Sequence, residues 1–488
     1  MTSQVEAERK YALADGQQLP PLDAAARPGQ VHEFDLVATY YDSPDCRLQR
    51  AKVVLRRREG GHDDGWHVKT PGDGDDERHE LHAPLGPPRP PSQLREQVEE
   101  ILDGAALVPL AVLRTHRREQ ELLGQDGAVL ALTTTDEVES TAGADRQSWR
   151  EAEVELVSGD AQLLDAVEQV LARAGIERSS SASKGGQAMQ GRVAAAAAIE
   201  DRSAGAVLLQ HASRQVGTLQ AYEAAVRSDG PDAVHKSRVA TRRLRSTLKT
   251  FAGVLDTDVT PLRAELRWHA ELLGAARDAE VLAERMLAAL EALPQPADPE
   301  VARLVSATLS DAHAAAHARL VESMDSPRYE ELHAALERFL AEPEFNRVAV
   351  DPAKMVLTPM LGHAVRGVRK LARAAAARPG ELGRWHEVRK AAKAARYGAE
   401  ALVPALGERA EDWRARWEAV TEALGAVQDC VVGGQAVADL AARAAAKDLP
   451  LQAFDELRHE QDRELAAALL SGRRALRKAL AKAPRDVG

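Results

Sequence analysis

Two segments of this chain each place one histidine and three cations at helical spacing. The first set is His235, Arg238, Arg242 and Arg245, and the second set is His386, Arg389, Lys393 and Arg396. The spacing i, i+3, i+7, i+10 brings four side chains within an arc of roughly 80° on one helix face, at about 100° per residue. Each member of the second set lies 151 residues after its counterpart. Such faces suit the oxygens of a polyanion.

A second pair of segments repeats at the same offset. Leu272–Asp278 (LLGAARD) is echoed by Ala423–Asp429 (ALGAVQD). Two motifs in one register indicate an internal duplication, so we predict two helical halves that share a two-fold cationic groove. The alternative is a solvated charged face. Such a face usually mixes acids with bases, whereas residues 234–249 contain no acid. The two histidines either donate to phosphate or pack.

A pattern of period two runs through the N-terminal part of the chain. Glu6, Glu8 and Lys10 share one strand face, as do Arg56 with Arg58, His67 with Lys69, and Glu151 with Glu153 and Glu155. A single strand with one polar face is common in soluble sheets. If this sheet closes into a barrel, acids and bases converge inside, where unpaired charges would be prohibitive. A wet tunnel would satisfy them, with carboxylates binding Mg²⁺ and cations clamping phosphate.

Composition limits the classes of partner. The 488 residues are enough for two to four domains. The net charge is −11 and aromatic residues make up 3% of the chain, which disfavours nucleic-acid binding because phosphate backbones would be repelled and bases would find few rings to stack on. Two distant cysteines exclude a disulfide framework and a cysteine metal site. The charged N-terminus and the lack of a long apolar run predict a cytoplasmic protein without a membrane span.

The element pattern divides the chain into two parts. We predict strands over 5–13, 33–42, 52–59, 65–70, 128–138 and 149–157. One helix should begin at Ser92 as the N-cap, and another should run from Asp160 to Gly175. This pattern favours an antiparallel α+β domain over 1–190. The segment 179–202 is the predicted boundary. The helical domain is predicted over 203–485, with halves of about 203–340 and 353–485 that are each long enough for a four-helix bundle.

The N-terminal part resembles the CYTH domain of the triphosphate tunnel metalloenzymes. The matching segments, in order, are VEAERKYAL, YYDSPDCRLQRAKVVLRRREG, WHVKTPG, RHEL, WREAEVEL and SASKGG. The resemblance implies an eight-stranded antiparallel tunnel that hydrolyses triphosphates with Mg²⁺ or Mn²⁺. It implies catalytic roles for Glu6, Glu8 and Lys10. The implied metal-binding acids are Glu6, Glu8, Glu80, Asp136, Glu153 and Glu155. The implied triphosphate-binding residues are Lys10, Arg56, Arg58, Lys69, Lys184 and Arg117, with Arg118 as the alternative to Arg117.

The C-terminal part resembles the CHAD family of helical repeat domains. The matching segments are VHKSRVATRRLRSTLKTF with LLGAARD, and WHEVRKAAKAARYGAEAL with ALGAVQD. The resemblance implies inorganic polyphosphate binding by the eight residues of the two helical sets. The second copy has Lys393 in place of Arg242 and Gln428 in place of Arg277, which makes it the weaker bidentate binder.

Together these patterns predict a metal-dependent triphosphatase, most simply of inorganic triphosphate, joined to a polyphosphate-binding domain. One alternative is a non-catalytic polyphosphate-binding protein associated with granules. Another is a nucleotide cyclase on the same tunnel fold. Metal-dependent phosphate release distinguishes the triphosphatase from the first alternative. Formation of cyclic AMP from ATP distinguishes the second alternative from both.

Overall fold

The computed structural model describes residues 2–72, 74, 76–181, 183–198 and 202–481 of the chain. They form two compact units. The first comprises Met1–Ile199 with Leu340–Glu342, and the second comprises Glu200–Phe339 with Pro343–Gly488. None of the described helices combines the length and the apolar composition that a membrane span requires.

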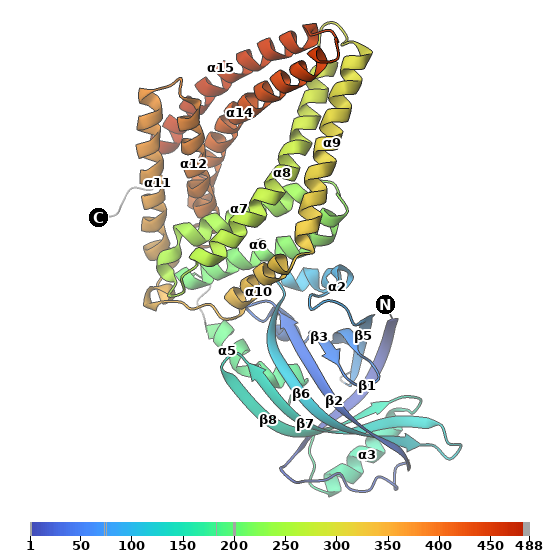
Figure 1. Ribbon diagram of the computed structural model, residues 1–488. Helices are drawn as coiled ribbons and strands as arrows, with labels where there is room; N and C mark the ends of the chain where they lie inside the picture. The colour runs from blue at the N-terminus through green and yellow to red at the C-terminus, as the bar shows by residue number, and fades with distance from the viewer. Residues whose placement is uncertain (1, 73, 75, 182, 199–201, 482–488) are drawn as a thin grey trace. The chain divides into compact units, whose positions relative to one another are not determined.

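The first unit is built on a closed antiparallel barrel of eight strands (Figure 1), as the sequence predicted. The strands are joined in the order β1-β5-β4-β3-β2-β6-β7-β8, and β8 pairs with β1 to close the barrel. Their bounds are β1 Thr2–Leu13, β2 Arg27–Asp42, β3 Val54–Glu59, β4 Gly65–Pro71, β5 Glu77–Pro84, β6 Val108–Leu123, β7 Val129–Ala142 and β8 Asp145–Leu156.

Two strands were not predicted from their own sequence pattern. β5 and β6 lie where we predicted no strand, and β2 begins at Arg27 rather than at residue 33. In both β5 and β6, charged residues occupy positions that face the barrel interior, so the apolar alternation that marks an ordinary strand is weak. A polar interior therefore hides strands from a hydrophobicity pattern.

Short helices accompany the barrel: α1 Arg47–Arg50, α2 Ser92–Leu102, α3 Ala161–Arg173, α4 Lys184–Ala188 and α5 Gln190–Ala198. The predicted cap of α3 is confirmed, because the Asp160 side chain accepts from Leu163 N at 3.2 Å and Gly175 adopts φ 72°. The predicted cap of α2 is wrong. Pro91, with φ −54° and ψ 142°, is the N-cap residue and Ser92 is already helical.

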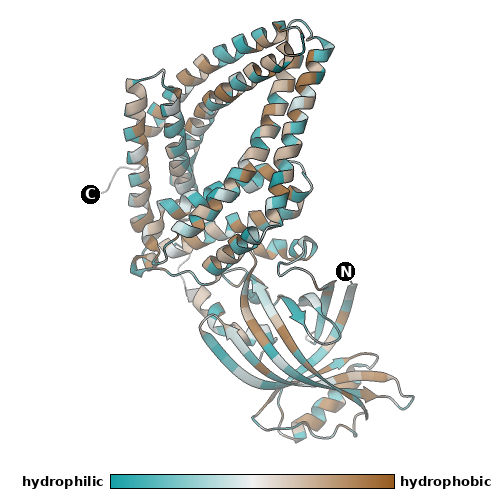
Figure 2. Ribbon diagram, viewed as in Figure 1, coloured by the Kyte–Doolittle hydropathy of each residue, from teal (hydrophilic) through white to brown (hydrophobic). Residues whose placement is uncertain are grey.

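The outer face of the barrel carries the apolar residues. Leu94 and Val98 of α2 pack with Trp66 of β4, and Val167 of α3 packs with Val154 of β8. Because side chains alternate along a strand, burying these residues outside turns their charged neighbours inward. Figure 2 shows the resulting alternation of hydrophobic and hydrophilic residues along the strands. The two helices thus fix which face of the sheet becomes the interior of the tunnel.

In the part of the second unit that the structure describes, all named elements are helices (Figure 1). Its helices are α6 Ala204–Arg227, α7 Ala233–Thr250, α8 Thr260–Glu291, α9 Pro299–Met324, α10 Pro327–Ala341, α11 Ala353–Ala377, α12 Leu382–Ala401, α13 Val403–Leu406, α14 Glu408–Ala445 and α15 Gln452–Ala481. The short 3-10 helices η1 Ala252–Val254 and η2 Arg347–Val350 lie between them.

Each half of the second unit contains four long helices around its own core, as predicted. Residues of α6 to α9 pack together in the first half, joined by Tyr329 of α10. Residues of α11, α12, α14 and α15 pack together in the second half. A third apolar cluster unites the ends of α8 and α9 with α14 and α15. The helices that carry the two repeated cationic sets, α7 and α12, also contact each other.

Candidate functional site

Charged side chains of β1, β3, β4, β5, β6, β8 and α4 line one interior cavity of about 270 Å³. Its walls include the predicted residues Glu6, Glu8, Lys10, Arg56, Arg58, Lys69, Arg117, Glu153, Glu155 and Lys184. The strand register explains why they meet, since Glu8 pairs with Glu155 and Lys10 with Glu153 across β1 and β8. The side chains that alternate with period two along each strand therefore point into the same interior, because the sheet is closed.

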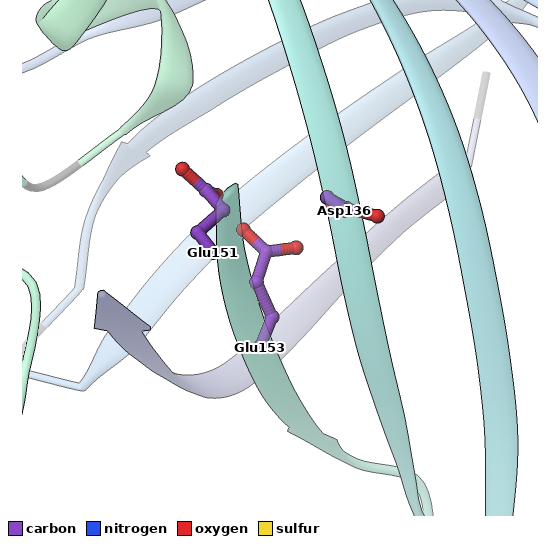
Figure 3. A group of neighbouring side chains, drawn as sticks. All are labelled: Asp136, Glu151 and Glu153. Atoms are coloured by element: carbon purple, nitrogen blue, oxygen red, sulfur yellow. The ribbon is translucent and has the colours of Figure 1, made fainter. Parts of the chain in front are cut away.

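Lys184 of α4 sits among three carboxylates. Its Nζ lies 2.8 Å from Asp136 Oδ2, 2.7 Å from Glu151 Oε1 and 2.7 Å from Glu153 Oε1. Glu151 and Glu153 come from β8 and Asp136 from the adjacent β7 (Figure 3). The ligand atoms of this triad lie within 4.8 Å of one another, a spacing that could hold a metal ion. In this arrangement the lysine ammonium supplies the positive charge that the triad needs.

Arg117 of β6 binds the same group of acids from another side. It donates two hydrogen bonds to Asp136, from Nε at 2.9 Å and from Nη2 at 2.8 Å, and a third to Glu153 at 3.0 Å. Arg118, its outward neighbour, is exposed, so Arg117 is the one that faces the tunnel. Burial raises the pKa of Glu153, but Lys10, Lys184 and Arg117 outweigh burial and hold it well below its usual range. This carboxylate is therefore firmly ionised.

A second acid cluster lies around Lys69 of β4. The Nζ of Lys69 is hydrogen-bonded to Glu6 and lies 3.7 Å from Glu80. His67 Nδ1 lies 2.8 Å from Glu80 Oε1. Burial, followed by the hydrogen bond to Glu80, raises the pKa of Glu6 to about 7. Burial lowers the pKa of His67 to about 3. The histidine is thus neutral near pH 7, and this cluster has more acid than its single lysine balances.

Glu8 and Glu155 extend this surplus of acid. Burial, then the charges of Glu8 and Glu153, raise the pKa of Glu155, while Lys69 opposes them. For Glu8, burial raises the pKa, but Lys10 and Lys69 outweigh it. Crowded, incompletely neutralised oxygen donors are the ligands that Mg²⁺ and Mn²⁺ prefer. The residues present therefore fit a hard divalent cation.

Arg56 and Arg58 of β3 show the opposite imbalance. Their Nε atoms are buried and have no hydrogen-bond partner among the residues that the structure describes. Arg58 forms an ion pair with Asp63, whose side chain is 54% exposed. Burial, together with the charges of Arg56 and Arg117, lowers the pKa of Arg58 to about 9. Two cations that repel each other inside a cavity provide a site for an anion.

Four further residues of the site were not selected from the sequence as ligands. Glu151 completes the triad around Lys184, and Gln4, Tyr40 and Arg78 line the cavity. Gln4 Nε2 donates to both Glu6 and Glu80, at 2.9 and 3.2 Å. The same alternation could have found them, because Gln4 precedes Glu6 by two residues and Arg78 precedes Glu80 by two.

In the second unit, cations of both repeat halves gather between α7 and α12. Arg238 and Arg242 of α7 lie close to Arg389 and Lys393 of α12. Burial, and then repulsion among these cations, lowers the pKa values of Arg242, Arg389 and Lys393. Burial, then Arg242, Arg389 and Arg238, lower the pKa of Lys393 to about 6. Neither Arg242 nor Lys393 has an ion-pair partner within the described part of the chain. The central cations of the two predicted faces thus lie together on one half-buried cationic surface.

The glycines of the second repeated motif (LLGAARD and ALGAVQD) lie next to arginines of the first repeated motif, on α7 and α12. A Cβ atom added to Gly274 of α8 would lie 3.9 Å from Arg238 Nε, and one added to Gly425 of α14 would lie 3.2 Å from Arg389 Nη2. The two glycines occupy equivalent repeat positions, as do the two arginines. The glycines leave room for the guanidinium groups to lie across the neighbouring helix. This packing is a structural reason for repeating both motifs in one register.

The outer members of the two sets differ. Arg396 Nη2 is hydrogen-bonded to Glu418, whereas Arg245 faces two further cations, Arg263 and Arg267, with Glu271 opposing them. His386 Nδ1 lies 2.7 Å from Gln428 Oε1. His235 is half-buried, and burial lowers its pKa. The two repeat halves therefore have similar contacts at the centre of the surface, as the two-fold pattern predicts, and different contacts at its ends.

Comparison with known proteins matches both units. The CYTH domain model matches residues 4–186 and the CHAD domain model matches residues 210–438. An uncharacterized protein of Mycobacterium tuberculosis is 32% identical, over 97% of this chain and 98% of its own. Similar solved structures include PptA from Streptomyces chartreusis, with 22% identity, a TM-score of 0.47, and coverage of 56% of this chain and 99% of that one.

The CHAD domain from the plant Ricinus communis is 24% identical, with a TM-score of 0.47 and coverage of 58% of this chain and 94% of that one. Near full-length similarity, two matched domain models and a closed eight-stranded barrel before a helical unit all agree. The chain belongs to the family of proteins in which a CYTH domain is followed by a CHAD domain.

Proposed function

We propose that the barrel is a metal-dependent triphosphatase that cleaves a phosphoanhydride bond of a linear triphosphate. The observation that carries this proposal is the charge pattern of the cavity. Acids outnumber cations around Glu6, Glu8 and Glu155, while Arg56 and Arg58 each have a buried Nε atom with no hydrogen-bond partner in the described residues. A metal triphosphate complex would supply what each side lacks, a cation for the acids and anionic oxygens for the arginines.

The proposed roles follow from these positions. Glu6, Glu8 and Glu155 would hold Mg²⁺ or Mn²⁺, with Glu80 and Glu153 next to them. When bound, the metal would stabilise charge on phosphoryl oxygens as a Lewis acid. Arg56, Arg58, Lys69 and Lys10 would bind and orient the phosphate chain. Asp136 and Glu151 would act indirectly, because Lys184 and Arg117 already engage their oxygens.

Phosphate release from inorganic triphosphate, with and without Mg²⁺, tests the proposal because this substrate carries nothing but the phosphate chain. Wild type should release phosphate only with the metal. Glu6→Gln and Glu8→Gln should each lower the rate of phosphate release at least a hundredfold, since Lewis-acid stabilisation contributes several kcal/mol. Glu33→Gln changes an exposed acid of β2 and should leave activity unchanged.

Three other results would contradict the proposal. Wild-type activity in both Gln variants at saturating Mg²⁺ would exclude these acids as metal ligands. Formation of cyclic AMP from ATP, without phosphate release from any triphosphate, would identify a cyclase. If neither reaction occurs but inorganic triphosphate binds, the tunnel is a binding module only.

We further propose that the second unit binds inorganic polyphosphate at the surface between α7 and α12. This rests on Arg242 and Lys393, which are half-buried yet lack an acidic partner in the described residues. A flexible polyanion would release counterions as it binds, so affinity should fall steeply with salt. Arg238 and Arg389 would contribute to the same surface, as would His235, Arg245, His386 and Arg396 around it.

Binding of long-chain polyphosphate to the full chain at several salt concentrations tests this proposal. The double variant Arg238→Ala with Arg242→Ala, and the double variant Arg389→Ala with Lys393→Ala, should each weaken binding and flatten its salt dependence. Arg458→Ala with Arg463→Ala removes two exposed arginines of α15 and serves as the charge-matched control. An effect from only one half would contradict a shared surface, and equal affinity for duplex DNA would indicate a general polyanion binder.

A further inference from the structure

The two repeat halves differ in charge beside the last arginine of each cationic set. In the second half, Glu418 of α14 lies between two arginines. Its Oε1 accepts a hydrogen bond from Arg396 Nη2, and its Oε2 accepts one from Arg414 Nη1 at 2.8 Å. Glu411 accepts further hydrogen bonds from Arg414 at 2.6–3.0 Å. Two arginines and two glutamates therefore neutralise each other at this end of the surface.

The first half keeps the two arginines but not the two acids. At the offset of 151 residues, the equivalent residues are Arg245 for Arg396, Arg263 for Arg414, Arg267 for Glu418 and Thr260 for Glu411. Neither Arg245 nor Arg263 has an ion-pair partner within the part of the chain that the structure describes. The carboxylate that joins the two arginines in the second half thus has no counterpart in the first.

The acids near these arginines are exposed and already engaged. Glu271 pairs with Arg267 at 2.8 Å, and both side chains are exposed. Asp258 attracts Arg263, but it is exposed and accepts a hydrogen bond from the first amide of α8 at 2.9 Å. Arg245 and Arg263 are half-buried, and the Nε atom of Arg263 is buried without a hydrogen-bond partner among the described residues. Because unsatisfied buried donors are costly, the two arginines favour an external anion.

A phosphate group suits this position. Glu418 shows the arrangement in the second half, where each of its two oxygens meets one arginine. Arg245 is the last cation of the α7 set, so the position continues the surface between α7 and α12. A terminal phosphate carries about two charges near pH 7 and three unshared oxygens, whereas an internal phosphate carries one charge and two such oxygens. Two arginines with a third beside them match the terminal group better.

We propose that Arg245, Arg263 and Arg267 bind the terminal phosphate of a polyphosphate chain whose other phosphates lie on the surface between α7 and α12. This inference rests on the proposed polyphosphate binding and adds the position of the chain end. The chain ends at the first half, because Glu418 fills the equivalent position in the second. Arg267 determines this specificity, since it stands where the second half has its neutralising acid.

Competition binding to the full chain compares two forms of polyphosphate of the same length. One form has free ends. In the other form both terminal phosphates are converted to alkyl phosphoramidates, which removes one charge and one unshared oxygen from each end. EDTA prevents metal-dependent hydrolysis of the chains. The form with free ends should bind wild type roughly tenfold more tightly, the scale of a hydrogen bond to a charged group.

Three variants test where the chain end lies. Arg267→Glu should lower the ratio of the two affinities below about twofold, because the new carboxylate can join the two neighbouring arginines as Glu418 does in the second half. Arg303→Glu makes the same charge change at an exposed arginine of α9 and should keep the ratio. Adding Glu411→Thr and Glu418→Arg to Arg267→Glu transfers the three-arginine pattern to the second half and should restore the ratio.

Equal binding of the two forms by wild type would overturn this inference and leave polyphosphate binding intact. Failure of wild type to bind either form would overturn the proposed polyphosphate binding as well. Because the barrel is also proposed to bind phosphate chains, Arg56→Ala is measured in parallel and should keep the ratio. A ratio that is lost in Arg56→Ala and kept in Arg267→Glu would put the chain end in the barrel and refute the inference.

Discussion

Replacing Lys184 with methionine removes the ammonium group that three buried carboxylates share. Its Nζ lies 2.7–2.8 Å from Asp136, Glu151 and Glu153, and its side chain is 8% exposed. Removing one partner of a buried ion pair costs about 3–5 kcal/mol. Lys184→Met keeps the length of the side chain, so the loss should come from charge rather than from a cavity. For a unit of this size, it corresponds to a melting temperature lower by roughly 6–20 °C.

The loss should shrink as the pH falls. In wild type, burial raises the pKa of Asp136 and of Glu153, but Lys184 and other cations outweigh it and hold both pKa values below their usual range. These carboxylates therefore stabilise the fold above the pKa of the unfolded chain, and that stability is lost only as the pH falls through their folded values. Without Lys184 the folded pKa values rise, and the ionised acids destabilise the barrel at higher pH.

Scanning calorimetry of the full chain at pH 7.5 and pH 5 measures both effects. Because a chain of two units need not unfold in two states, the transition temperatures are compared directly. Lys249→Met replaces an exposed lysine of α7 and should move neither transition. A transition temperature lower by less than about 2 °C, or an equal decrease at both pH values, would refute the reasoning that Lys184 balances a buried acid triad.

Three further changes should have separate and measurable effects. Arg56→Ala should weaken calorimetric binding of a non-hydrolysable triphosphate by about 1.5–3 kcal/mol, while Arg118→Ala, on the outer face, should not; equal effects would mean that the β3 register is wrong. Polyphosphate affinity should rise from pH 8 to pH 6 and level off below, because the pKa of Lys393 is about 6 in the free protein and a polyanion favours its charged form. Lys393→Gln should flatten this profile, and an unchanged profile would exclude Lys393 as the titrating group. Glu418→Gln should release Arg396 and steepen the salt dependence of polyphosphate binding by about one charge; an unchanged slope would show that Arg396 stays outside the bound path.

The interior of the barrel was predictable because charged side chains keep the strand period. Glu6, Glu8 and Lys10 face the cavity as their spacing predicted, and the closed sheet brings them to Glu153 and Glu155. The resemblance selected Lys184 as a site residue, which periodicity could not do, but it did not indicate that Lys184 pairs with three carboxylates. This lysine lies on a short helix beyond the last strand, and only the tertiary fold delivers it to Asp136.

The helical unit shows a similar division between pattern and context. The repeat offset correctly predicted that α7 and α12 would carry equivalent cations. It did not reveal that one end of this surface is neutralised. The position equivalent to Glu418 in the first half is Arg267, so the same site on the scaffold carries opposite charges in the two halves. The repeat fixes equivalent positions on the backbone, whereas the residue at each position sets the local balance of charge.

The position of Lys184 along the chain also governs the order in which the barrel can be completed. All eight strands leave the ribosome before this lysine, since β8 ends at Leu156. Until α4 docks, Asp136, Glu151 and Glu153 leave excess negative charge on the paired strands β7 and β8. The barrel also closes by pairing its first strand with its last, a contact that is slow to form. A fragment that stops after the final strand would therefore be an incomplete folding unit, and the shortest autonomous barrel should extend through Met189.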